Sequence, residues 1–209
     1  MRDLTKTLND WLEADGCEIG EVAIARADGG FELCHRSDLG RTDLRAEVGA
    51  QAARFIATYD EAGRFRPLKT APNLKRGWKL RVANLRELRR ALDFFYPAML
   101  GIWGSHCDAE LVPVPLRTTL GRQTGMYRVT QKLTDEQAQT LIGGFCRSDG
   151  GCLKHLLWRI APEVPIQTLP AEKLHPPPAG VSLPMLCHEA CNLLVAQARV
   201  LVKKSEKPE

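Results

Sequence analysis

The chain has 209 residues and a net charge of +4, and its 44% hydrophobic and 26% charged residues are ordinary for a globular protein, which excludes fibrous repeats and global disorder. No apolar run approaches the roughly 20 residues that span a bilayer, and the opening MRDLTKTLND is polar where a signal peptide needs an apolar core. We therefore expect a cytoplasmic protein without membrane contact, in which seven cysteines favour metal binding over disulfides.

The N-terminal residues predict a short helix and a β-hairpin. Helical spacing over residues 3–14 puts four apolar side chains on one face, namely Leu4, Leu8, Trp11 and Leu12. Residues 22–33 alternate apolar with small or polar side chains around Asp28-Gly29-Gly30, which is typical of a hairpin with a glycine turn. A second helix is predicted to begin at a cap formed by Thr42 or Asp43. Its apolar face would hold Leu44, Val48, Ala52 and Phe55.

A strongly basic segment follows an acidic one. Residues 1–62 hold 7 basic and 13 acidic side chains, whereas residues 63–90 hold ten basic ones against Glu87 alone. Residues 64–82 predict a basic loop with one short strand near 78–82. The segment is either a solvated face or a contact surface for a polyanion, and Trp78 is the aromatic residue best placed to stack on a base.

The sequence then predicts a helix, followed by a boundary between two domains. A capping box at Asn84–Glu87 opens the helix, and the aromatic cluster that includes Phe95 and Tyr96 is assigned to the core. Glycine and proline dominate after Gly104. We therefore divide the chain into an N-terminal α+β region, residues 1–104, and a second domain, residues 105–209.

The second domain is predicted to be mainly helical. A capping box at Thr134–Gln137 opens one helix, and another begins near Cys187. Seven prolines in residues 162–184 predict an extended arm between these helices, and the C-terminal KKSEKPE is expected to be disordered. The fold class is therefore α+β, mainly helical, with a small N-terminal α/β region before a helical domain that carries a proline-rich arm.

Four cysteines form two close pairs. Cys146 and Cys152 bracket a turn-forming segment, while Cys187 and Cys191 are expected on one face of a helix start. The arm is long enough to bring the pairs together, which favours Zn²⁺ or an iron–sulfur cluster.

The spacing of the ligands helps to choose between these cofactors. Structural zinc sites use tighter cysteine knuckles than C-x₅-C, whereas the wider spacing suits a [4Fe-4S] cluster. The helix start, Arg147, Lys154 and the N–H groups of Gly150 and Gly151 are expected to favour its negative charge. Zinc, and thiols with no shared site, stay open as alternatives. The remaining cysteines are assigned to small buried hydrophobic positions, and they are Cys17, Cys34 and Cys107.

Several strings resemble one known family. They are RFRPLKTAPNLKRGWKL (64–80), FYPAMLGIW (95–103), PVPLRTTLGRQTGMYRVTQKLTDEQ (113–137), CRSDGGCLKHLLW (146–158) and CHEACNLLV (187–195). The family is an iron–sulfur-binding domain with a small stabilising region, found in bacterial proteins that also carry a module similar to sirohydrochlorin cobaltochelatase. The resemblance implies a [4Fe-4S] cluster held by Cys146, Cys152, Cys187 and Cys191. We expect no chelatase module in 209 residues, and therefore an accessory role without chelatase activity.

Three functions are compatible with these features. The first is an electron-transfer or redox accessory protein, linked to tetrapyrrole or cobalamin-type metabolism, with a redox partner protein. The second is an enzyme whose cluster borders a pocket for an acidic small molecule. The third is a nucleic-acid-binding module with a structural cluster. A basic stretch before the first cysteine supplies candidate residues for anion binding or cluster tuning, namely Arg117, Arg122, Tyr127, Arg128 and Lys132.

Overall fold

The computed structural model describes residues 3–66, 74–146 and 152–206, and the chain forms two compact units. Met1–Glu110 and Pro177–Met185 make the first unit. Leu111–Pro176 and Leu186–Glu209 make the second. The proline-rich arm therefore contributes a segment to the first unit before the chain returns to the second. The architecture is mixed, with a strand-containing N-terminal region followed by a mainly helical region, as the sequence predicted.

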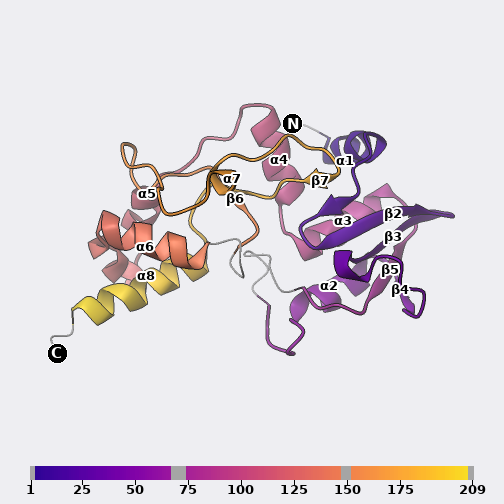
Figure 1. Cartoon of the computed structure of the whole chain (residues 1–209), viewed down its shortest axis with the longest axis horizontal. Helices are drawn as coiled ribbons and strands as arrows, with labels where there is room; N and C mark the ends of the chain where they lie inside the picture. Colours follow the sequence, from indigo (N-terminus) through magenta and orange to yellow (C-terminus); the bar gives the residue numbers. More distant parts are fainter. Residues whose placement is uncertain (1–2, 67–73, 147–151, 207–209) are drawn as a thin grey trace. The chain divides into compact units, whose positions relative to one another are not determined.

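The first unit is built on a sheet. Among the described residues its strands lie in the order β4-β5-β3-β2-β1-β7, and Figure 1 shows β2, β3, β5 and β4 next to one another. The strands are β1 (Glu18–Ile19), β2 (Val22–Ala27), β3 (Gly30–His35), β4 (Ala46–Val48), β5 (Lys79–Val82) and β7 (Ser182–Leu183). The helical segments are α1 (Leu4–Glu13), η1 (Arg36–Asp38), α2 (Ala50–Thr58), α3 (Leu85–Phe95) and α4 (Met99–Cys107).

The predicted hairpin and first helix are confirmed. β2 and β3 pair antiparallel from Val22↔His35 to Ala27↔Gly30, and Gly29 takes a φ of +78° in the turn between them, where a side chain would be strained. Asp3 caps α1 by accepting hydrogen bonds from the N–H groups of Thr5 and Lys6.

The second predicted helix begins later than the sequence indicated. Residues Ala46–Val48 form β4, which pairs in parallel with β5, and α2 begins only at Ala50, after Gly49. Neither Thr42 nor Asp43 caps it. Val48 and Phe55, which were predicted to be buried, are exposed, and α2 buries Ala53 and Ile56 instead. The pairing of β4 with the sheet outweighs the local helical pattern.

The basic segment 63–90 is only partly a loop. It includes β5 and the start of α3, while residues 67–73 lie outside the described part of the chain. Trp78 is 5% exposed and stacks on Phe95, with ring centroids 5.0 Å apart. This tryptophan is therefore a core residue and not a stacking platform for a base.

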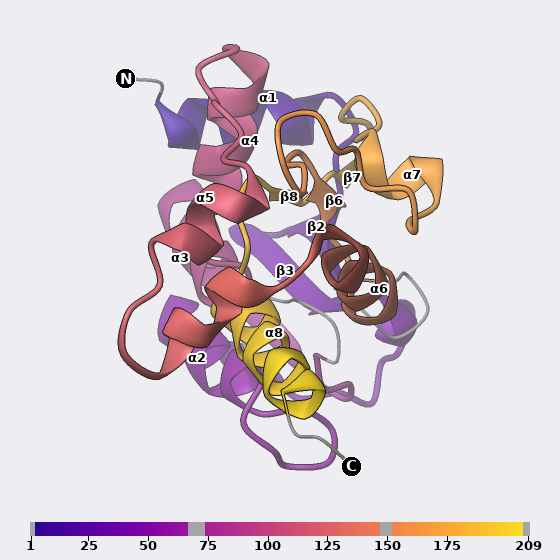
Figure 2. The same ribbon diagram turned by 90° about the vertical axis from the view of Figure 1, so that its left-hand side faces the viewer.

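The second unit contains a small two-stranded sheet and several helices. Its elements are α5 (Leu116–Gly121), η2 (Gly125–Lys132), α6 (Asp135–Phe145), β6 (His155–Leu156), α7 (Ala171–Leu174), β8 (Leu186–Cys187) and α8 (Asn192–Ser205). Helices α6 and α8 lie side by side (Figure 1 and Figure 2). Their core includes Leu116 and Leu120 of α5, Ile142 of α6, Trp158, and Leu194 of α8.

The capping box of α6 is confirmed. Thr134 Oγ1 accepts a hydrogen bond from the N–H of Gln137, and the Gln137 side chain accepts one from the N–H of Thr134. At the other end of α6 the helix stops at Cys146, as predicted.

The last helix differs from its prediction at both ends. Cys187 lies in β8, where Leu186 and Cys187 pair in parallel with His155 and Leu156, and α8 begins after Cys191. Cys187 and Cys191 are therefore not on one helical face. At the C-terminus the helix continues to Ser205, through residues that were expected to be disordered, while residues 207–209 lie outside the described chain.

Three further observations concern the remaining predictions. Cys17 and Cys34 are half-buried and Cys107 is exposed, so the burial predicted for these thiols is wrong for Cys107. The predicted core residues Phe95 and Tyr96 are buried. No helix in the described part of the chain is long and apolar enough to cross a membrane.

Candidate metal centre

The four paired cysteines occupy the ends of elements in the second unit. Cys146 follows the last residue of α6, and its N–H donates to the carbonyl of Ile142 at 2.8 Å. Cys152 comes directly after the undescribed residues 147–151. Cys187 ends β8, where its carbonyl accepts a hydrogen bond from Leu157, and Cys191 is the N-cap of α8. A strand end and two helix ends thus hold thiols that are far apart in sequence.

The four thiols converge. Each of their six pairs is close enough for the negative charges on the sulfurs to repel one another. Cys146 and Cys152 are buried, and Cys187 and Cys191 pack against the core that contains Cys146. The convergence that was expected from the sequence spacing is therefore present, although a strand and a helix cap bring Cys187 and Cys191 together.

Burial makes the thiolate forms unfavourable without a cofactor. It is the largest cause that raises the pKa of Cys146 and of Cys152, and the neighbouring thiolates raise the pKa of Cys146 further. Burial also raises the pKa of Cys187 to about 11, against the opposing effect of a hydrogen bond from Trp158. Cys146, Cys152 and Cys187 are therefore protonated at neutral pH, and binding of a metal group must release those protons.

Three of the sulfurs have N–H donors beside them. The indole N–H of Trp158 donates to Cys187 Sγ at 3.3 Å, and the backbone N–H of Leu194, in the first turn of α8, donates to Cys191 Sγ at 3.4 Å. A hydrogen bond from the Lys154 backbone lowers the pKa of Cys152. Such donors favour sulfur that carries negative charge, whether as thiolate or as a cluster ligand.

Lys173 adds a buried cation. It lies in α7, is 5% exposed, and donates from Nζ to the carbonyl of Cys152. Burial lowers the pKa of Lys173, while the thiolates of Cys152 and Cys146 act in the opposite direction. The sequence reasoning missed Lys173, because a lone lysine in a proline-rich arm has the pattern of a solvated residue. It also missed Trp158. The only indication in the sequence was that this tryptophan lies shortly after Cys152, in CRSDGGCLKHLLW.

This donor set fits a four-thiolate cluster. It supplies four converging thiols, N–H donors to the sulfurs and a buried cation for the negative charge. Within the described residues, no group of three or more His, Cys, Asp or Glu side chains already has the arrangement that holds a metal ion. The predicted contributions of Arg147, Gly150 and Gly151 fall on residues outside the description.

The predicted basic residues lie elsewhere in the same unit. Both Nη atoms of Arg117 are engaged, one by the carbonyl of Leu133 and one by the carboxylate of Asp135, so this arginine holds the start of α6. Lys132 pairs with Glu206 at 2.5 Å. The cations that lower the pKa of Cys146, Cys152 and Cys187 most are Lys154 and Lys173.

The other members of that set differ in exposure. Tyr127 packs on the core with the guanidinium of Arg199 5.8 Å from its ring centroid, so its ring is already covered by a cation. Arg122 and Arg128 are exposed. These two arginines are the members of the set that are best placed to meet a partner.

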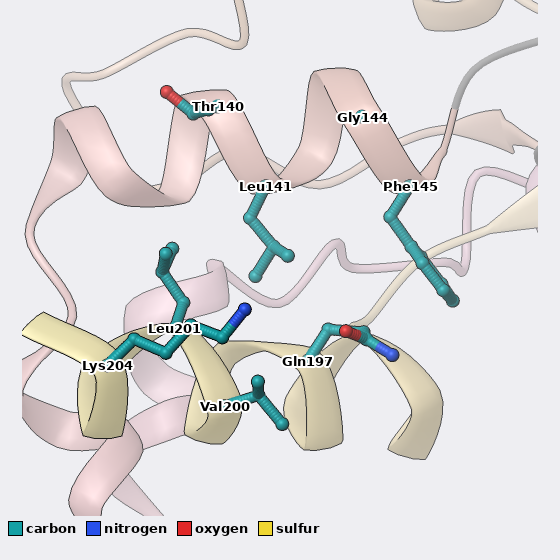
Figure 3. Close-up of a pocket in the computed structure, with 8 residues that line it drawn as sticks. All are labelled: Thr140, Leu141, Gly144, Phe145, Gln197, Val200, Leu201 and Lys204. Atoms are coloured by element: carbon teal, nitrogen blue, oxygen red, sulfur yellow. The ribbon is translucent and has the colours of Figure 1, made fainter.

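An apolar groove lies beside the end of α6, next to Cys146 in the chain. It has a volume of about 350 Å³ between α6 and α8, and Leu141 and Phe145 point from α6 toward α8 (Figure 3). Phe145 precedes Cys146 in the chain. The lining of the groove holds one charged side chain, Lys204, and no carboxylate.

Comparison with known families identifies both regions. Residues 108–200 match the family of the 4Fe-4S iron-sulfur cluster binding domain, and residues 5–107 match that of the DR2241 stabilising domain. These matches confirm the resemblance that the sequence showed to both families, and the cofactor of the chain is a [4Fe-4S] cluster.

A solved structure combines the same parts. DR2241 from Deinococcus radiodurans is 30% identical to this chain, with a TM-score of 0.79 over 96% of this chain and 41% of that chain. It is described as a multi-domain protein with structural similarity to chelatases and with two additional novel domains. A search of curated proteins found no match. The chain thus spans 41% of the length of DR2241.

Proposed function

We propose that this chain is a one-electron carrier whose [4Fe-4S] cluster is held by Cys146, Cys152, Cys187 and Cys191. The observation that carries the proposal is the convergence of four buried or half-buried thiols in one unit. Four protein thiolates complete the coordination of the cluster and leave no iron open to a substrate. When bound, the cluster supplies reversible one-electron chemistry.

The surrounding residues have defined tasks in this function. Trp158 and the first turn of α8 hold Cys187 and Cys191 by N–H donation to sulfur. The apolar core, with Leu156 and Ile142, excludes water from the buried side of the site. A rigid, dry surrounding requires little reorganisation when the charge of the site changes.

The proposed setting is a cytoplasmic pathway of tetrapyrrole or cobalamin type. It is supported by the chelatase-like structure of DR2241, since chelatases insert metal ions into tetrapyrroles. The reducing cytosol would keep the four ligands as thiols until the cluster is installed.

The proposed partner is a protein with an acidic contact surface. Exposed Arg122 and Arg128, and Lys204 in the groove, would attract it electrostatically. The test compares oxidation of the reduced protein by an anionic cobalt(III)–EDTA complex and by cationic cobalt(III) hexaammine. The double variant Arg122→Glu/Arg128→Glu should slow the anionic oxidant and accelerate the cationic one. Unchanged rates with both would contradict the role of these arginines.

The function itself is tested on anaerobically prepared protein. Iron and sulfide analysis should give four of each per chain, as a [4Fe-4S] cluster requires, and dithionite should produce a reduced-cluster EPR signal that disappears on reoxidation. A cluster that cannot be reduced and reoxidised without losing iron would reject electron transfer. An EPR signal that changes on addition of a tetrapyrrole would instead favour an enzyme with an accessible iron.

A further inference from the structure

Two buried side chains direct their polar groups to the cysteines. Trp158 is 2% exposed and directs its only polar group, the indole N–H, to Cys187 Sγ at 3.3 Å. Lys173 is 5% exposed and directs Nζ to the carbonyl of Cys152. They come from different segments and contact different ligands.

We propose that Trp158 and Lys173 raise the reduction potential of the cluster, an inference that rests on the proposed electron-transfer function. Reduction adds one electron, taken from a one-electron donor protein, to a cluster that is already negative when four thiolates bind it. No bond is made or broken and no proton is needed. A group that stabilises negative charge therefore stabilises the reduced cluster more than the oxidised one.

The hydrogen bond from Trp158 acts in a setting that makes it strong. The ring belongs to the same core as Cys146 and Leu194, so water does not compete for the N–H. Cys187 is also held through its backbone, because its carbonyl accepts a hydrogen bond from Leu157 at 2.8 Å. The donor and the sulfur are thus both fixed, and the hydrogen bond should shorten as the sulfur gains electron density.

Lys173 requires a counter-charge that the described protein does not supply as a carboxylate. A buried cation is unfavourable unless an anion compensates it. Among the described residues Lys173 forms no ion pair, and the groups that act on it electrostatically are the thiolates of Cys152 and Cys146. The negative cluster that these cysteines hold is the natural counter-charge.

The test measures the midpoint potential of the reconstituted full-length protein under anaerobic conditions. Trp158→Phe keeps the aromatic ring and removes the N–H, and it should lower the equilibrium constant for reduction about tenfold, equal to about 59 mV for one electron. Lys173→Met removes the charge at similar length and should lower the constant by at least as much. Lys173→Arg keeps the charge, and its midpoint potential should stay close to that of the wild type.

Matched controls separate this effect from a general loss of packing. Lys203→Met removes an exposed lysine of the same unit, and Trp103→Phe alters a half-buried tryptophan of the other unit. Both should keep the wild-type potential. Trp158→Phe should also raise the Fe–S(Cys) stretching frequency in resonance Raman spectra of the oxidised protein, because loss of an N–H donor strengthens the Fe–S bond.

The outcomes separate the two proposals. A wild-type cluster that is reduced reversibly, with potentials of Trp158→Phe and Lys173→Met within the spread of the controls, would overturn this inference and leave electron transfer intact. If the wild-type cluster cannot be reduced, electron transfer fails. The Raman comparison then still decides whether Trp158 acts on the cluster, and an unchanged spectrum counts against it. If Lys173→Met does not fold, Lys173→Gln takes its place.

Discussion

Among the described residues, each unit buries one long basic side chain, and the charge of that side chain is compensated differently in the two units. In the first unit Arg66 is 1% exposed, lies 5.5 Å from the ring centroid of Tyr96, and interacts electrostatically with the carboxylate of Glu21. In the second unit Lys173 interacts with cysteine thiolates. The first unit thus carries its own counter-charge, whereas the counter-charge that we propose for the second is a negative cofactor. This difference predicts that the stability of the first unit does not depend on the cluster and that the second unit is less stable without it.

The strongest way to test the comparison is to remove one ligand. Cys187→Ser should abolish nearly all cluster binding, because the remaining three thiolates cannot complete the coordination. The second unit should then lose the stabilisation that comes from binding. Iron analysis and hydrogen exchange would follow both effects, with protection lost in residues 152–176 and 186–206 but kept in β2 and β3. The control Cys34→Ser should keep the full iron content, and equal iron in both variants would disprove the ligand assignment.

The corresponding change in the first unit removes the carboxylate whose charge favours the Arg66 cation. Glu21→Gln should destabilise this unit by about 2 kcal/mol, because the buried guanidinium keeps its charge and loses the Coulomb attraction of the carboxylate. Glu21 also accepts a hydrogen bond from the N–H of Leu74 at 2.8 Å, which the amide can keep. Denaturant unfolding would measure the effect, with the exposed Glu61→Gln as the control. Loss of iron from Glu21→Gln would contradict the independence of the two units.

Without the cluster, high pH should affect the stability of the two units differently. The pKa of the Cys187 thiol is raised to about 11 in the folded protein, so between its ordinary value near 9 and 11 the unfolded chain has lost a proton that the folded chain retains. The stability of the apo second unit should fall in this window, by up to about 1.4 kcal/mol per pH unit and thiol. Thermal unfolding of apo protein at pH 8 and pH 10.5 would show it. Cluster-loaded protein, whose thiolates are already ligands, should not share the loss.

Mild acid should have the smallest effect, and it should act on the first unit. Burial lowers the pKa of His35, although the carboxylates of Glu21 and Asp38 act against this. The unfolded chain therefore takes up a proton near pH 6.5 that the folded chain accepts only at lower pH, and stability falls as the pH drops below 6.5. His35→Gln should flatten this part of the curve. An equal slope in both proteins would show that other groups are responsible.

Local patterns predicted the local elements well. The caps at Asn84 and Thr134 and the turn at Gly29 are decided by neighbouring residues, and all three are where the sequence indicated. The helix predicted from Thr42 begins only at Ala50, because the pairing of β4 with β5 depends on a strand more than 30 residues away.

The same limit applies to the site. Cysteine spacing indicated which thiols meet, but it placed Cys187 on a helix, since the partner strand β6 has only two residues and no pattern of its own. Nothing local marks Lys173 as buried, because its burial follows from the packing of α7 beside β6.

The path of the chain between the two cysteine pairs has a consequence for the gene as well as for the protein. After Cys152 the chain enters the first unit, where β7 pairs with β1, and Gly180 and Val181 accept hydrogen bonds from Trp11, Cys17 and Glu18. Only then does it deliver Cys187. No single cut in the coding sequence can therefore separate the two units intact, because a fragment that encodes residues 1–104 leaves the edge of β1 unpaired. Recombination should consequently transfer the two units together, as one continuous coding segment.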